Sequence, residues 1–175
     1  MSDKNPETVY LDSCTYLDYL KGDHALHDQM QLMMDDWKAG NVRLVTSALT
    51  IAEVLWVKCD EDTARAMVDR SREPEIVALF EPPREQPFTL VEVTRVTAMA
   101  ARELVWDYGV KPKDAIHIAS ALAAHCPVFY TNDGRLQKFS EKVKGAPVLR
   151  IEAPTWTKQT VLDLPDDPAP PAPAS

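Results

Sequence analysis

The stretch V-Y-L-D-S, residues 9–13, decides the fold, because a short apolar run that favours β structure stops abruptly at an aspartate and a serine. Residues 14–20 follow with apolar side chains at helical spacing, so this part of the chain predicts a strand, a tight turn and a helix. A related order occurs at V-F-Y-T-N-D-G, residues 128–134, which precedes a short helix expected around 135–139. Both predicted strands therefore end at an aspartate, Asp12 in the first and Asp133 in the second.

Strands and helices alternate through the rest of the sequence. Hydrophobic periodicity and capping residues predict further strands at 42–46, 88–93 and 148–151, and helices at 24–38, 48–58, 62–70, 94–109 and 111–125. Prolines punctuate the chain between residues 73 and 86, on both sides of residues 76–80. This order predicts an α/β fold, a three-layer α/β/α sandwich with a central, mainly parallel sheet.

Length and composition indicate a single globular domain. The chain has 175 residues, of which 45% are hydrophobic and 26% charged. We expect the domain to cover residues 1–151 and a proline-rich tail to cover 152–175, since proline lacks the backbone donor that regular structure needs. The longest apolar stretches are too short for a membrane span, and residues 1–7 do not resemble a secretory signal. With three widely spaced cysteines, this predicts a cytoplasmic protein with free thiols.

The formal net charge of −8 argues against a protein that holds nucleic acid on a broad basic surface. Residues 152–175 hold four acidic residues and one lysine, a net −3, which leaves −5 for the remainder. Four of the acids in that remainder are candidates for binding metal ions. Bound divalent cations would offset most of this charge, so the formal count overstates the repulsion of RNA.

Four acidic residues are positioned to meet at one edge of the sheet, beyond the carboxyl ends of the strands, where open parallel sheets bind ligands. Asp12 and Asp133 end predicted strands, although aspartate is also common in ordinary turns. Glu53 lies on a mostly apolar helix face, where a carboxylate loses hydration unless it swings out to water. Asp114 falls in the first turn of a helix, a position that the helix dipole alone would favour.

The carboxylates of such a cluster indicate which cofactor would bind there. Carboxylates about 5 Å apart would repel by roughly 3 kcal/mol per pair at an effective dielectric constant near 20, so the cluster requires cations. Hard oxygen ligands, with no cysteine or histidine at metal-binding spacing, favour Mg²⁺ or Mn²⁺ over Zn²⁺. Such ions support the hydrolysis of phosphodiester bonds.

Four segments together resemble the PIN-domain family. They are V-Y-L-D-S (9–13), S-A-L-T-I-A-E-V (47–54), K-P-K-D-A-I-H-I-A-S-A-L (111–122) and V-F-Y-T-N-D-G-R-L (128–136), and the match spans about residues 8–151. The resemblance implies the sandwich fold and a metal-dependent nuclease site. It also implies that Asp12, Glu53, Asp114 and Asp133 are the family's catalytic and metal-binding acids, all of them present here.

Residues beside these acids have expected supporting roles. We expect Ser13, Thr131 and Asn132 to orient an acid or a water molecule. Three basic residues flank the acids and could hold RNA phosphates, or could equally be solvated surface charges; they are Lys111, Lys113 and Arg135.

Two other side chains near the acids have simpler explanations than catalysis. His117 could be imagined as a general base, but a packed or hydrogen-bonded helix residue is the favoured interpretation. Cys14 has no identifiable histidine partner, so a small buried residue is favoured over a nucleophile.

The small size resembles VapC-like ribonuclease toxins of toxin-antitoxin pairs, which implies an RNA substrate, a cognate antitoxin and a homodimer. A housekeeping RNA-processing nuclease and a catalytically silent module that binds RNA or protein are the alternatives. A magnesium phosphatase with an aspartyl nucleophile fits less well, because no second aspartate stands close to Asp12 in the sequence.

Overall fold

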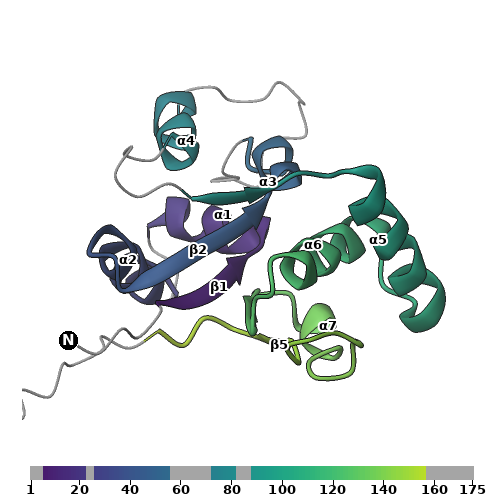
Figure 1. The fold of residues 1–175 in the computed structure, drawn as a ribbon. Coiled ribbons are helices and arrows are strands. Elements are labelled where there is room, and N and C mark those ends of the chain that lie inside the picture. The colour runs from purple at the N-terminus through teal and green to yellow at the C-terminus, as the bar shows by residue number, and fades with distance from the viewer. Residues whose placement is uncertain (1–5, 23–25, 56–71, 82–87, 157–175) are drawn as a thin grey trace, which may run out of the picture.

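One five-stranded parallel sheet organises the molecule (Figure 1). The computed structural model describes residues 6–22, 26–55, 72–81 and 88–156. The strand order is β3-β2-β1-β4-β5, and every neighbouring pair is parallel. The strands are β1 (Glu7–Leu11), β2 (Val42–Ser47), β3 (Thr89–Val91), β4 (Val128–Tyr130) and β5 (Arg150–Glu152). This arrangement confirms the predicted α/β fold with a central parallel sheet.

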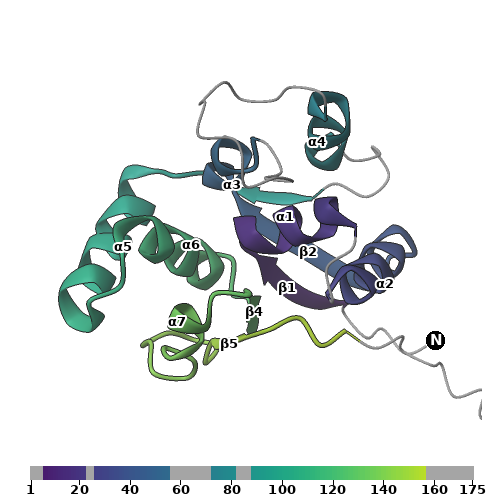
Figure 2. The same ribbon diagram turned by 180° about the vertical axis from the view of Figure 1, so that it is seen from behind.

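Helices cover both faces of the sheet (Figures 1 and 2). They are α1 (Ser13–Lys21), α2 (His27–Lys38), α3 (Ala48–Glu53), α4 (Glu73–Phe80), α5 (Arg95–Tyr108), α6 (Pro112–Ala123) and α7 (Gly134–Gln137). Apolar side chains of α1, α2 and α4 belong to one core, and those of α5, α6 and α7 belong to the other. No helix in the described part of the chain is long and apolar enough to cross a membrane.

Strand β1 lies in the middle of the sheet and contributes to both cores. Val9 and Leu11 face the core beneath α1 and α2, whereas Tyr10 faces the core beneath α5 and α6. All three side chains are fully buried. Alternation of side chains along a central strand explains why the run is apolar throughout rather than at every second position.

Several helix ends are fixed by the residues that the sequence indicated. The Ser47 side chain caps α3 by accepting a hydrogen bond from the backbone N–H of Leu49 at 3.2 Å. Thr94 caps α5 in the same way, through the N–H of Thr97 at 3.2 Å. Gly109 ends α5 with a φ of 68°, a left-handed conformation that glycine adopts without a Cβ penalty.

Several predicted elements differ from the structure in their bounds or were not foreseen. The helix expected at 48–58 ends at Glu53, and Val54 has already left helical geometry with a ψ of 74°. Helix α4 was not predicted, because Pro74 was interpreted as punctuation; it lies in the first turn, where proline needs no N–H partner. Strand β5 begins at Arg150 rather than at 148. The helix predicted at 62–70 lies outside the described residues.

Candidate functional site

Asp12 is a buried acid at the carboxyl end of β1. Its side chain caps α1, accepts a hydrogen bond from the backbone N–H of Thr15 at 3.2 Å and is 5% exposed. The thiol of Cys14 donates to the carboxylate, and a hydrogen bond from Thr131 also reaches it. Among the described residues no lysine or arginine forms an ion pair with this group, and burial raises the pKa of Asp12.

Asp133 lies just beyond the carboxyl end of the neighbouring strand β4. It caps α7 by accepting from the backbone N–H of Arg135 at 2.8 Å. The Arg135 guanidinium also donates to both carboxylate oxygens, with Nη2 2.6 Å from Oδ2 and Nε 3.0 Å from Oδ1. These hydrogen bonds lower the pKa of Asp133, so the carboxylate is ionised and already has a cationic partner.

Asp114 is the half-buried acid in the first turn of α6. Burial raises its pKa, and the negative charge of Asp133 raises it further. The positive charges of Lys111 and Arg135 offset part of this effect. Asp114 and Asp133 therefore lie close enough to repel each other.

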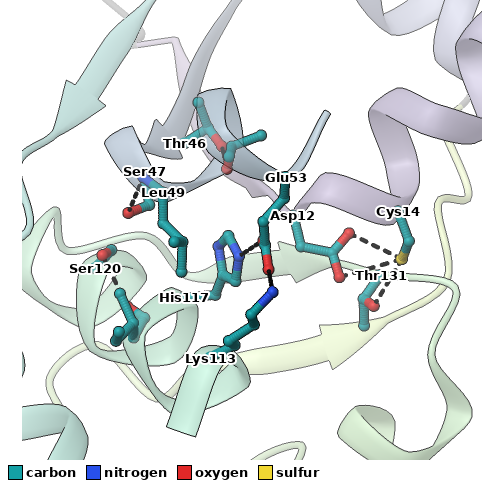
Figure 3. A network of polar contacts seen from close by, with 12 residues as sticks. Asp12, Cys14, Thr46, Ser47, Leu49, Glu53, Lys113, His117, Ser120 and Thr131 are labelled. Carbon is teal, nitrogen blue, oxygen red and sulfur yellow. Dashed lines mark hydrogen bonds and ion pairs between the residues drawn. The ribbon is translucent and has the colours of Figure 1, made fainter. Parts of the chain in front are cut away.

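Glu53, the last residue of α3, is held by groups from two other segments (Figure 3). Its Oε2 atom lies 2.7 Å from Nε2 of His117, and its Oε1 atom lies 3.3 Å from Nζ of Lys113. The hydroxyl of Ser13 donates a further hydrogen bond. The hydrogen bond from His117 contributes most to lowering the pKa of Glu53 to about 2.

Cys14 and Thr131 connect the Asp12 and Asp133 ends of the site. The Thr131 hydroxyl accepts the backbone N–H of Asp133 at 3.0 Å and lies 3.4 Å from the Cys14 sulfur. That sulfur accepts the backbone N–H of Asn132 at 3.3 Å. The Asn132 side chain donates to Asp18 on α1.

The four predicted acids thus surround one end of the sheet, but they are not pre-assembled as a complete ligand set. Within residues 6–22, 26–55, 72–81 and 88–156, no three histidine, cysteine or acidic side chains are placed to hold one ion together. Two of the four acids have cationic partners instead, Arg135 for Asp133 and Lys113 for Glu53. Asp12 and Asp114 have raised pKa values that a cation would lower.

The donor chemistry at this end of the sheet fits a hard divalent cation. Carboxylate oxygens predominate, and Asp12 is a buried acid that lacks a cationic partner in the described part of the chain. A bound cation would compensate the desolvation of this carboxylate. Glu53 and Asp133 could join such a site only by giving up contacts to Lys113 and Arg135.

The predicted RNA-binding residues occupy different settings. Lys111 is exposed at the amino end of α6, and the Lys113 side chain is 72% exposed while it contacts Glu53. Arg135 contacts Asp133. The role of these three residues in binding phosphates stays a prediction.

Sequence reasoning missed the partners that hold the acids in place. His117 is confirmed as a hydrogen-bonded helix residue, but its contact with Glu53 was not foreseen. Its position three residues after Asp114 was a usable signal, because that spacing places two helical side chains on one face. Tyr10 contacts His117 from β1, and an alternating position in an apolar strand gave no indication of this.

Comparison with known proteins identifies the family. The sequence profile of the PIN domain matches residues 9–142, so the chain belongs to the PIN-domain family. No curated protein matches the chain.

Solved structures show the same fold at low sequence identity. One is the Mycobacterium tuberculosis toxin VapC20, described as cleaving the sarcin-ricin loop, with 15% identity and a TM-score of 0.55 over 74% of this chain and 93% of that one. Another is VapBC2 from Rickettsia felis bound to a DNA fragment from their promoter, with 14% identity and a TM-score of 0.54 over 83% of this chain and 98% of that one. The chains of both solved structures are matched over nearly their whole length.

Proposed function

We propose that this chain is a ribonuclease that hydrolyses RNA phosphodiester bonds with Mg²⁺ or Mn²⁺. The nuclease domain would cover residues 1–151. One observation carries the proposal. Asp12 is a buried carboxylate at the carboxyl end of the central strand, without a cationic partner among the described residues, at the same edge of the sheet as the mutually repelling Asp114 and Asp133. An apolar side chain would be less costly at this position unless a cation binds there.

The residues of this site would have different roles in the reaction. Asp12 and Asp114 would hold the metal, and Glu53 and Asp133 would complete the site. When bound, such an ion lowers the pKa of a water molecule and offsets the charge that develops on phosphoryl oxygens. Lys111, which is exposed at the amino end of α6, and Lys113 would bind phosphates of the RNA.

Cleavage of a single-stranded RNA across a titration of Mg²⁺ and Mn²⁺ tests this proposal. We expect cleavage that requires the metal and is abolished in Asp12→Asn and in Asp114→Asn. Asp107→Asn is the matched control, because Asp107 is an exposed acid on α5 and its loss removes the same charge. Metal-independent cleavage, or full activity in Asp12→Asn, contradicts the proposal.

Two other activities give different results in the same assay. A catalytically silent binding module would retain RNA in a gel-shift experiment without cutting it at any metal concentration. A magnesium phosphatase would release phosphate from small phosphate esters, for which we expect no turnover.

We further propose that the protein is the toxin of a toxin-antitoxin pair, acts on RNA in the cytoplasm as a homodimer, and is blocked by a cognate antitoxin. The support is the fold that it shares with VapC20 and with the VapBC2 complex. Coexpression with the product of the neighbouring reading frame should restore growth that the nuclease alone arrests. Light scattering should give the mass of a dimer. A housekeeping nuclease would leave growth unaffected.

A further inference from the structure

His117 is a buried polar residue that joins two segments through its ring nitrogens. It is 3% exposed, and its Nε2 atom lies 2.7 Å from Oε2 of Glu53. Its Nδ1 atom lies 2.8 Å from the hydroxyl oxygen of Tyr10. Figure 3 shows the imidazole beside Glu53, with Lys113 approaching the carboxylate from the same helix, α6. Both polar atoms of the ring therefore have a partner inside the protein.

The chemistry of the carboxylate fixes the direction of the hydrogen bond between His117 and Glu53. Glu53 is ionised and can only accept, so Nε2 of His117 carries a proton and donates it. Burial and the nearby charge of Asp12 raise the pKa of Tyr10, so the phenol keeps its proton and can donate to Nδ1. Tyr10 thus restrains the His117 ring at Nδ1, while Nε2 donates to Glu53.

The other restraints on Glu53 are weaker, and the hydrogen bond from Ser13 lowers its pKa less than the one from His117 does. Lys113 contacts the other carboxylate oxygen at 3.3 Å, but its side chain is 72% exposed. A solvated ion pair of this kind contributes little, because water screens the attraction and the long side chain loses conformational freedom. His117 is therefore the main determinant of where this carboxylate lies.

The same contacts connect segments that carry three of the predicted acids. Tyr10 precedes Asp12 by two residues on β1, and His117 follows Asp114 by one helical turn on α6. Glu53 is brought in from α3. A buried chain of hydrogen bonds across three segments holds their relative positions more firmly than separate surface contacts would.

We propose that His117, oriented by Tyr10, is a positioning residue that holds the Glu53 carboxylate at this edge of the sheet in the arrangement needed for metal binding and RNA cleavage. This inference rests on the proposed nuclease function. His117 touches neither RNA nor metal in this role. Removing a group that hydrogen-bonds to a metal ligand and orients it typically lowers metal affinity or activity by about 10- to 100-fold.

The kinetic test compares three variants at the site and one control variant with the wild type. His117→Ala should lower kcat by about 10- to 100-fold and leave the KM for RNA unchanged, since Glu53 is lost to the reaction rather than to RNA binding. His117→Gln, which keeps a side-chain N–H, should recover part of the loss. Tyr10→Phe preserves the packing and should cause a smaller decrease in kcat. His125→Asn, outside the site, should behave as the wild type.

A second measurement does not depend on catalysis. In the metal-free protein, nuclear magnetic resonance should detect a slowly exchanging proton on Nε2 of His117. The signal should shift in Tyr10→Phe. It should be lost in Glu53→Ala, because a proton without its acceptor exchanges rapidly with water. Calorimetry with Mn²⁺ should show weaker binding to His117→Ala by about tenfold.

The two proposals fail in different ways. If the wild type cuts no RNA, the nuclease assignment fails, while the Nε2 proton and the Mn²⁺ affinity still decide the role of His117. If the wild type cuts RNA and folded His117→Ala and Tyr10→Phe match it in kcat and in Mn²⁺ affinity, the positioning role is overturned. A His117 ring that carries its proton on Nδ1 alone also overturns it.

Discussion

The thiol sulfur of Cys14 lies 3.0 Å from one carboxylate oxygen of Asp12 and 3.2 Å from the other. The same sulfur accepts the backbone N–H of Asn132, so it links the carboxyl ends of β1 and β4. A thiol in this position donates its proton to a buried carboxylate and remains protonated. Cys14 is therefore part of the structure that supports Asp12 and is unsuited to attack a substrate.

We expect Cys14 to react slowly with alkylating agents in the folded protein. Burial, and to a lesser extent the charge of Asp12, raises the pKa of its thiol to about 12. At about pH 8 this leaves roughly a thousandfold less thiolate than an ordinary cysteine provides. Mass spectrometry of the Cys59→Ser variant after alkylation should find Cys14 unmodified until denaturant is added. Rapid labelling of the folded protein would contradict this expectation.

Replacing Asp12 by asparagine should stabilise the metal-free protein while it abolishes cleavage. Burial raises the pKa of Asp12, so ionising the folded protein costs more than ionising the unfolded chain. The wild type therefore loses stability relative to Asp12→Asn as the pH rises from about 4 toward neutrality. We expect a difference of about 1 kcal/mol at neutral pH, measured by chemical denaturation, and almost none in acid.

Metal addition should reverse that order of stability. Mg²⁺ or Mn²⁺ binds the folded wild type and should raise its Tm by mass action, whereas Asp12→Asn should not respond. Asp107→Asn, which removes an exposed acid, should respond as the wild type does. A metal-induced shift of equal size in Asp12→Asn would show that the ion binds elsewhere.

The strands, the helices and the parallel character of the sheet were predictable because their signals are local. Apolar runs such as residues 9–11 and 128–130 are too hydrophobic for a half-exposed strand, and caps such as Thr94 and Gly109 mark where a helix begins or ends. Helix α4 was not predicted because proline both breaks helices and begins them. Which of the two applies depends on the residues that pack against Ile76, and these are distant in the sequence.

The location of the predicted acids at one edge of the sheet followed from the sequence, but their contacts did not. Strand ends place Asp12 and Asp133 at one edge, because parallel strands share that edge. The partner of each acid could not be assigned, since His117 and Glu53 are 64 positions apart and meet only after α3 and α6 pack at the sheet. Local spacing does explain why Arg135 reaches Asp133, as the two residues share one turn.

Arg135→Met should raise the pKa of Asp133. The guanidinium donates to both carboxylate oxygens and is the main reason that this pKa is lowered. A carboxyl with a lowered pKa contributes stability above its unfolded pKa and loses that contribution as the pH falls through its folded value. The variant should therefore be less stable than the wild type near neutrality and equal to it in strong acid.

A carbon-detected magnetic resonance titration of the Asp133 carboxyl measures that shift directly. Lys138→Met removes one positive charge from the end of the same helix and serves as the control. An Asp133 pKa that is unchanged in Arg135→Met would show that the ion pair does not persist in solution.

Trp156→Phe should destabilise the fold, because Trp156, the last residue that the structure describes, forms a hydrogen bond to α2. Its indole Nε1 donates to Oδ2 of Asp36 at 2.7 Å, and both residues are buried. Phenylalanine keeps most of the packing but leaves a buried carboxylate without this donor, at a cost of about 1–3 kcal/mol. Denaturation followed by circular dichroism measures the loss. Trp106→Phe is the matched control, since Trp106 is 67% exposed and its replacement should change stability by less than about 0.5 kcal/mol. Equal stability of the Trp156→Phe and Trp106→Phe proteins would mean that the hydrogen bond to Asp36 contributes nothing to holding this segment.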